Sequence, residues 1–63
     1  MIQIHPTAIV SPKAKLGENV IVEPFAWIHD NVEIGNDSWI GPHVIIYDGA
    51  RIGSEVKIYQ SAS

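Results

Sequence analysis

The sequence predicts an all-β protein, a parallel β-helix of about three triangular coils, and a six-residue period is the first observation that predicts it. Over 63 residues, an aliphatic side chain recurs at every sixth position without an insertion, and the fourth residue after each aliphatic is small. Such a period fits neither the 3.6-residue turn of a helix nor the plain alternation of a strand. The aliphatic slots are Ile4, Val10, Leu16, Val22, Ile28, Ile34, Ile40, Ile46, Ile52 and Ile58, and the small slots are Ala8, Ala14, Val20, Ala26, Val32, Ser38, Val44, Ala50, Val56 and Ala62.

A second period of eighteen residues sets the number of strands in each coil. Prolines and glycines at the corners recur with this spacing. Three hexads therefore make one lap, and the chain holds about three and a third laps whose strands stack about 4.8 Å apart. The recurring corner residues are Pro6, Pro24 and Pro42, and Gly17, Gly35 and Gly53.

Each hexad divides into a short strand and a corner. The small slot, the next residue and the aliphatic form an in-out-in strand, as in Ala8-Ile9-Val10. The three residues between strands must turn the chain, and corners such as Gly35-Asn36-Asp37 consist of residues that tolerate turns or positive φ. The first corner, His5-Pro6-Thr7, has the composition of a turn as well.

The outward residue of each strand distinguishes three faces. One face carries side chains of alternating charge, an order that suits neighbouring strands in water. The other two faces point large apolar groups outward, and a stacked apolar column is typical of an interface. The outward residues are Lys15, Glu33 and Arg51 on the first face, Ile9, Trp27 and Ile45 on the second, and Gln3, Ile21, Trp39 and Lys57 on the third.

Two apolar faces beside one charged face predict association with other subunits. The alternative is a helix or loop of the same chain that covers the columns, and the 63 residues contain no such segment. A ring in which each prism touches two neighbours would cover both faces, which predicts a homotrimer. The predicted subunit interface consists of Ile9, Trp27, Ile45, Ile21 and Trp39.

Composition excludes several other classes of protein. The chain has no cysteine, so disulfide bonds and a cysteine-based zinc site are excluded. The net charge is −3 and the basic residues are scattered, which argues against nucleic acid as a partner. The N-terminus lacks the pattern of a signal peptide, and no apolar run is long enough for a membrane span. We therefore expect a soluble, cytoplasmic protein.

The search for chemical groups finds no active site in this chain. His5 and His43 share a corner two coils apart, too far to ligate one zinc ion, and His29 lies at another corner. A metal site shared between subunits stays open, but polar corner roles are the simpler interpretation. No nucleophile stands beside a base, and the spaced glycines form no phosphate loop. We assign no catalytic, substrate-binding or metal-ligating residue and expect no cofactor.

Four segments carry a resemblance to a known family. The chain is similar to the N-terminal coils of the UDP-N-acetylglucosamine acyltransferases, which open lipid A biosynthesis. The final segment is the more specific mark, because the repeats and the His-Pro-Thr start are shared among many β-helix acyltransferases. The segments are Ile4-His5-Pro6-Thr7-Ala8-Ile9-Val10, Val22-Glu23-Pro24-Phe25, Val32-Glu33-Ile34-Gly35 and Ile58-Tyr59-Gln60-Ser61-Ala62-Ser63.

The resemblance implies a left-handed coil, although the general rule for parallel crossovers favours the right hand. It also implies a homotrimer that transfers a 3-hydroxyacyl chain from acyl carrier protein to the 3-hydroxyl of UDP-N-acetylglucosamine. A histidine in a later coil acts as general base in that family, and its segment lies beyond residue 63. Residues 1–63 are therefore expected to be one partial β-helix domain, the N-terminal fragment of a longer solenoid, and inactive alone.

Three alternatives remain at this point. The N-acyltransferase that acts on UDP-3-O-acylglucosamine shares the hexads but normally has a separate N-terminal domain before them. A γ-class carbonic anhydrase would need histidines that converge across a subunit interface. A non-catalytic solenoid that serves only for trimerisation would need no active site at all.

Overall fold

The computed structural model describes residues 1–60, which form ten two-residue strands joined by corners. Among these residues no helix is present that could cross a membrane. The small slot predicted at Ala62 lies outside the described residues. The strands are β1 (Gln3–Ile4), β2 (Ile9–Val10), β3 (Lys15–Leu16), β4 (Ile21–Val22), β5 (Trp27–Ile28), β6 (Glu33–Ile34), β7 (Trp39–Ile40), β8 (Ile45–Ile46), β9 (Arg51–Ile52) and β10 (Lys57–Ile58).

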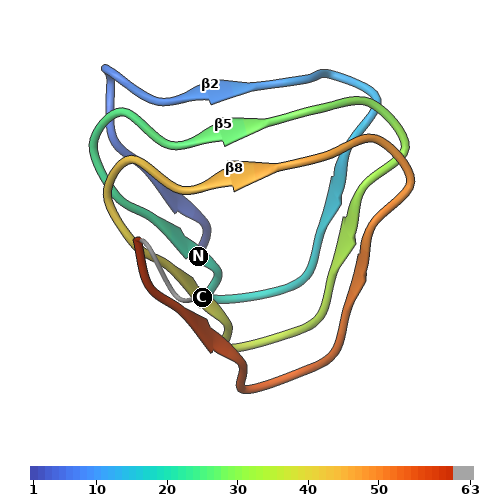
Figure 1. Ribbon diagram of the computed structural model, residues 1–63. Coiled ribbons are helices and arrows are strands. Elements are labelled where there is room, and N and C mark those ends of the chain that lie inside the picture. Colours follow the sequence, from blue (N-terminus) through green and yellow to red (C-terminus); the bar gives the residue numbers. More distant parts are fainter. Residues whose placement is uncertain (61–63) are drawn as a thin grey trace.

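The strands make three parallel sheets, one on each side of a triangular coil (Figure 1). Sheet 1 contains β1, β4, β7 and β10, sheet 2 contains β2, β5 and β8, and sheet 3 contains β3, β6 and β9. Figure 1 shows β2, β5 and β8 stacked in chain order along one side. The fold is a left-handed parallel β-helix of about three coils, as the family resemblance implied.

The register of the sheets confirms the eighteen-residue period. On sheet 2, Ile9 pairs with Trp27 and Trp27 pairs with Ile45. On sheet 3, Glu33 pairs with Lys15 on one side and Arg51 on the other. Residues eighteen apart therefore lie directly above one another, and each face carries the outward column that the sequence predicts.

The core runs along the axis of the coil and is most complete in the middle. Ile28 and Ile40 are fully buried, and valines of the small slots close the spaces between them. Ile4, in the first coil, is 44% exposed because that coil is covered from one side only. The buried apolar residues are Val20, Val22, Ala26, Ile28, Val32, Ile34, Ile40, Val44 and Ile46.

Ser38 is the buried polar residue of this core, and its hydroxyl is satisfied. The Ser38 Oγ donates to the backbone oxygen of Gly53 at 2.8 Å and accepts the Val56 N–H at 3.3 Å. Both partners belong to the next coil, so the hydroxyl joins two coils without leaving an unpaired buried group.

Most corners share one backbone feature, a positive φ, which their residue types predict only in part. The residue before each small slot, from the second coil onward, has φ in the left-handed region. At four of these corners its N–H donates to a carbonyl oxygen of the preceding coil, for example His43 to Pro24 at 3.1 Å. The residues with positive φ are Asn19, Phe25, Asn31, Asp37, His43, Gly49 and Glu55.

The first two corners differ because no earlier coil lies beneath them. Thr7 and Lys13 occupy the same slot but have no positive φ. The N–H of the following alanine closes these two turns, from Ala8 to the His5 oxygen at 2.9 Å and from Ala14 to the Ser11 oxygen at 3.0 Å, and the same bond occurs later from Ala26 to Glu23 and from Ala50 to Tyr47. The left-handed corner is thus associated with stacking on a preceding coil.

One expectation about local structure needs correction, and the role of two glycines becomes clear. The strands are two residues long instead of three, since the N–H of a small slot such as Ala8 bonds within its own turn. Gly17 and Gly35 do not have positive φ; their coils approach closely instead. A Cβ on Gly35 would lie 2.6 Å from the backbone carbon of Gly53, so only glycine fits there.

Candidate subunit-association surface

Sheet 2 presents an exposed apolar column that nothing in residues 1–60 covers. Ile9 is 59% exposed, Trp27 45% and Ile45 46%, and the three side chains are stacked in register. Exposed columns of this kind are unusual on a protein surface that faces only water. The column therefore has the character of an association surface.

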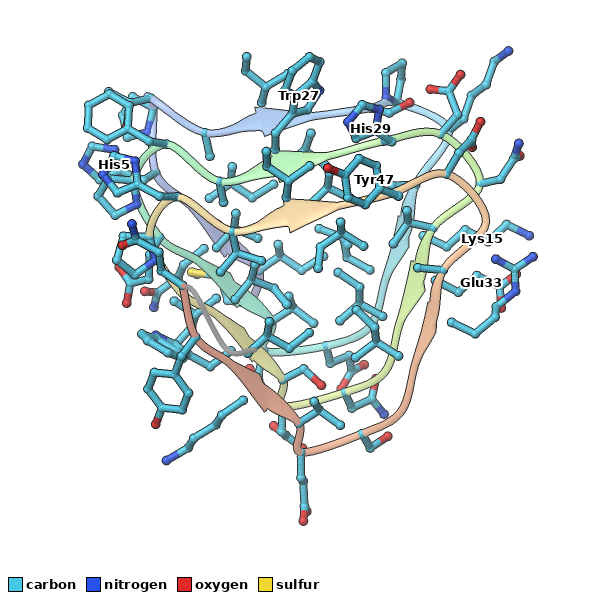
Figure 2. All side chains as sticks on the ribbon, in the orientation of Figure 1. His5, Lys15, Trp27, His29, Glu33 and Tyr47 are labelled. Atoms are coloured by element: carbon cyan, nitrogen blue, oxygen red, sulfur yellow. The ribbon has the colours of Figure 1, made fainter. Side chains whose placement is uncertain are left out.

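Aromatic stacking extends this column toward the next corner. The ring of His29 lies 4.5 Å from that of Trp27 and 5.7 Å from that of Tyr47, measured between centroids and with nearly parallel planes. Figure 2 shows the three side chains gathered on the outer side of sheet 2. Such stacking restricts the motion of the rings, which lowers the side-chain entropy that association would cost.

Sheet 1 presents a second apolar surface that is more enclosed. Ile21 and Trp39 are half-buried and paired in register. The Trp39 Nε1 donates to Glu23 Oε2 at 2.6 Å, and the Tyr59 ring lies 5.0 Å away at an interplanar angle of 56°. The polar atom of Trp39 is thus satisfied within one copy, while its ring remains partly open.

Sheet 3 has the opposite character. Its outward residues are Lys15, Glu33 and Arg51, and the Arg51 Nε lies 3.7 Å from Glu33 Oε1. Figure 2 places Lys15 and Glu33 on the side away from His5. All three side chains are exposed, so this face is a solvated surface.

Sheets 1 and 2 meet at a corner that we call the proline corner, made of residues 5–7, 23–25 and 41–43. The exposed Phe25 ring stacks on His43 at 5.1 Å with planes 19° apart. Thr7 lies below them, and its Oγ1 accepts the Phe25 N–H at 3.2 Å. The same hydroxyl lies 2.8 Å from His5 Nδ1, so the first turn is tied to the second coil.

The structure places the five predicted interface residues on two faces. Ile9, Trp27 and Ile45 form one column, while Ile21 and Trp39 belong to the adjacent sheet. The two groups do not meet within one copy, because each points outward from its own sheet. They flank the proline corner, which the sequence did not identify as part of the surface.

The three histidines are corner residues, each with a local partner. His5 bonds to Thr7, His29 stacks between Trp27 and Tyr47, and His43 stacks on Phe25. Within residues 1–60, no three side chains of the metal-binding types lie close enough to hold one ion.

The corner residues Phe25, Tyr47 and Tyr59 all take part in ring pairs. The sequence interpretation missed that histidines are two of the partners. The eighteen-residue period contains this information, since it pairs Phe25 with His43 and His29 with Tyr47.

A family profile matches part of this chain, in agreement with its repeated fold. The profile of the family described as bacterial transferase hexapeptide (six repeats) matches residues 31–62. A search of the curated proteins finds no match.

Two solved acyltransferases have similar structures. UDP-N-acetylglucosamine acyltransferase from Campylobacter jejuni has a TM-score of 0.86 and 30% identity, with 89% of this chain and 22% of that chain covered. The Arabidopsis UDP-N-acetylglucosamine acyltransferase has a TM-score of 0.52 and 31% identity, with 89% and 24% covered. This chain therefore spans less than a quarter of the length of either enzyme.

The family profile covers half of the chain, and its six-residue repeats coincide with the strands β6 to β10 and the corners between them. The chain is a member of the bacterial transferase hexapeptide family.

Proposed function

We propose that this chain is the N-terminal β-helix scaffold of an acyltransferase that acts on UDP-N-acetylglucosamine. In the proposed reaction, a 3-hydroxyacyl chain moves from acyl carrier protein to the 3-hydroxyl of the sugar nucleotide. This would be the first step of lipid A biosynthesis, carried out in the cytoplasm by a homotrimer. Residues 1–63 would supply coils and association surface, and no catalytic group.

The observation that carries the proposal is the match to the Campylobacter enzyme over 89% of this chain. Its 30% identity and TM-score of 0.86 support a shared arrangement of coils as well as a shared repeat. The segment Ile58-Tyr59-Gln60-Ser61-Ala62-Ser63 adds a motif that is more specific than the hexads.

The predicted inactivity of the 63-residue chain rests on its side chains. A general base must lie within hydrogen-bond reach of the substrate proton and must have a place for substrate beside it. The imidazoles of His29 and His43 are stacked on aromatic rings, and His5 is engaged with Thr7. We therefore assign the chemistry to coils other than these.

An acyl-transfer assay on the protein encoded by the complete gene tests the reaction. With 3-hydroxyacyl acyl carrier protein and UDP-N-acetylglucosamine, we expect the 3-O-acylated sugar nucleotide by mass spectrometry. The 63-residue chain, assayed in parallel at the same concentration, should give no product above the buffer control.

The same assay separates the alternatives. Transfer only to the amino group of UDP-3-O-acylglucosamine would assign the chain to the N-acyltransferase instead. A folded protein that transfers to neither acceptor would contradict the proposed reaction and favour a non-catalytic trimerisation module. Product from the 63-residue chain alone would contradict the scaffold role.

A further inference from the structure

The corner between sheets 2 and 3 contains an Asp-Gly sequence, Asp48-Gly49, and both residues are exposed. An aspartate carboxyl can react with the backbone nitrogen of the residue that follows it. A following glycine favours this reaction, because it has no Cβ that obstructs the approach. The other two aspartates of the chain, Asp30 and Asp37, precede asparagine and serine, whose side chains do obstruct it.

The reaction has two steps and leaves the composition of the chain unchanged. The Gly49 nitrogen attacks the protonated carboxyl of Asp48 and forms a bond to its Cγ, and the N–H proton leaves with the carboxyl OH as water. Water then opens the resulting imide ring. Where it breaks the bond between the nitrogen and the Asp48 backbone carbon, the chain continues through Cβ and Cγ, and the backbone carbon becomes a free carboxylate. The product is isoaspartate.

We propose that Asp48 is a site of isoaspartate formation that the folded corner keeps closed. The modification then marks chains in which this corner has opened. This inference is independent of the acyl-transfer reaction, because it depends only on the backbone and side chains of the third coil.

The backbone of this corner keeps the reacting atoms apart. Gly49 has φ of +83°, whereas φ of Asp48 is not positive. The Ala50 N–H donates to the Tyr47 oxygen at 3.2 Å, which completes a type II turn with ψ of Asp48 at about +120°. Tetrahedral geometry places Cβ over the following nitrogen only at ψ of about −120°. The peptide after Asp48 must therefore rotate by about a third of a turn before the ring can close.

Hydrogen bonds to two coils oppose this rotation. The Gly49 N–H, whose nitrogen is the nucleophile, donates to the Asp30 oxygen of the preceding coil at 3.2 Å. The Arg51 Nη1 donates to the Gly49 oxygen at 3.0 Å and also to the Asn31 oxygen. The guanidinium thus ties carbonyl groups of consecutive coils together, and the corner opens only when these bonds break.

The modification would also prevent the corner from closing again. Isoaspartate adds one carbon to the main chain at Asp48, while the repeat allows six residues for each side of the coil. Strand β9 would then lose its register with β6, in which Arg51 pairs with Glu33. Modified chains should therefore accumulate instead of returning to the native fold.

Peptide mapping after incubation at one pH and temperature, in native buffer and in guanidinium chloride, tests the proposal. Electron-transfer fragmentation distinguishes isoaspartate from aspartate, although their masses are equal. In denaturant we expect isoaspartate to form faster at Asp48 than at Asp30 or Asp37. In native buffer we expect formation at Asp48 to be at least about tenfold slower, because an opening free energy of about 1.4 kcal/mol already reduces the open population tenfold.

Two methionine variants test the role of the guanidinium. Arg51→Met removes the bonds to Gly49 and Asn31, and in native buffer it should speed isoaspartate formation by about threefold to tenfold. Lys15→Met is the matched control, because it removes the same charge from the same sheet and leaves the hydrogen bonds of Gly49 and Arg51 in place. Its rate should equal that of the wild-type chain.

Gly49→Ala tests the chemistry without any requirement for folding. In denaturant its methyl group should slow ring closure at Asp48, and an undiminished rate would overturn the site. Faster formation at Asp30 or Asp37 than at Asp48 in denaturant would overturn it as well.

Circular dichroism in native buffer shows whether each chain is folded. Equal rates in native buffer and in denaturant, from a folded wild-type chain, would contradict the closed turn. If Arg51→Met and Lys15→Met are both folded and react at the same rate, the guanidinium does not hold the corner closed.

Discussion

Gly49 has φ of +83°, and a Cβ built on it would meet nothing within 4 Å. Its substitution by alanine therefore measures the cost of the left-handed backbone without any clash. We expect Gly49→Ala to lower the free energy of unfolding by about 1–2 kcal/mol, the usual penalty for an L-residue in this region. Urea unfolding followed by circular dichroism, at one fixed protein concentration, gives the value.

Gly53→Ala is the control for this prediction, because its site is equally open and its φ is not in the left-handed region. This variant should be neutral or more stable by up to about 1 kcal/mol, since alanine restricts the unfolded chain. Equal losses in the two variants would show that left-handed strain is not what Gly49 relieves.

Single residues also show the limit of sequence interpretation. Glycine, asparagine and aspartate at the corners predicted turns, and Asn19, Asn31, Asp37 and Gly49 do have positive φ. Phe25 also has positive φ, although phenylalanine is not a residue type that predicts this conformation. Thr7 and Lys13 occupy the same slot without positive φ, so the slot and the stacking on a preceding coil together decide the conformation, and the residue type only changes its cost.

At the scale of the element, contact between coils limits what a corner can hold. A Cβ on Gly35 would lie 2.6 Å from both the Gly53 carbon and the Ser54 nitrogen, which are backbone atoms. Gly35→Ala must therefore push two coils apart, and we expect a loss of about 1–3 kcal/mol. The same urea titration measures this loss of unfolding free energy. A loss no larger than that of Gly53→Ala would show that the two coils can move apart at this corner without a cost in stability.

The strands show why the sequence was informative about the fold. An uninterrupted six-residue period fixes which residue points inward, and the eighteen-residue period fixes which strands are neighbours. The pairing of Ile9 with Trp27 and Ile45 follows from these periods alone. Strand length does not follow from them, because hydrogen bonds inside turns, such as that of Ala8 to His5, compete with the sheet.

For the whole molecule, the candidate surface could be predicted only in part. Outward apolar residues were visible as columns, since strand alternation determines their direction. The proline corner was not identified, because its aromatic and histidine side chains fall in corner slots that resemble ordinary turns.

Light scattering at micromolar concentration is the most direct measurement of association through sheets 1 and 2. The chain has a mass of 6.9 kDa, and we expect the scattering mass to be three times that value. Ile45→Glu, which puts a charge in the middle of the sheet 2 column, should reduce it to the monomer value, whereas Arg51→Ala on sheet 3 should leave it unchanged. A wild-type chain that is folded and stays at 6.9 kDa would contradict the account.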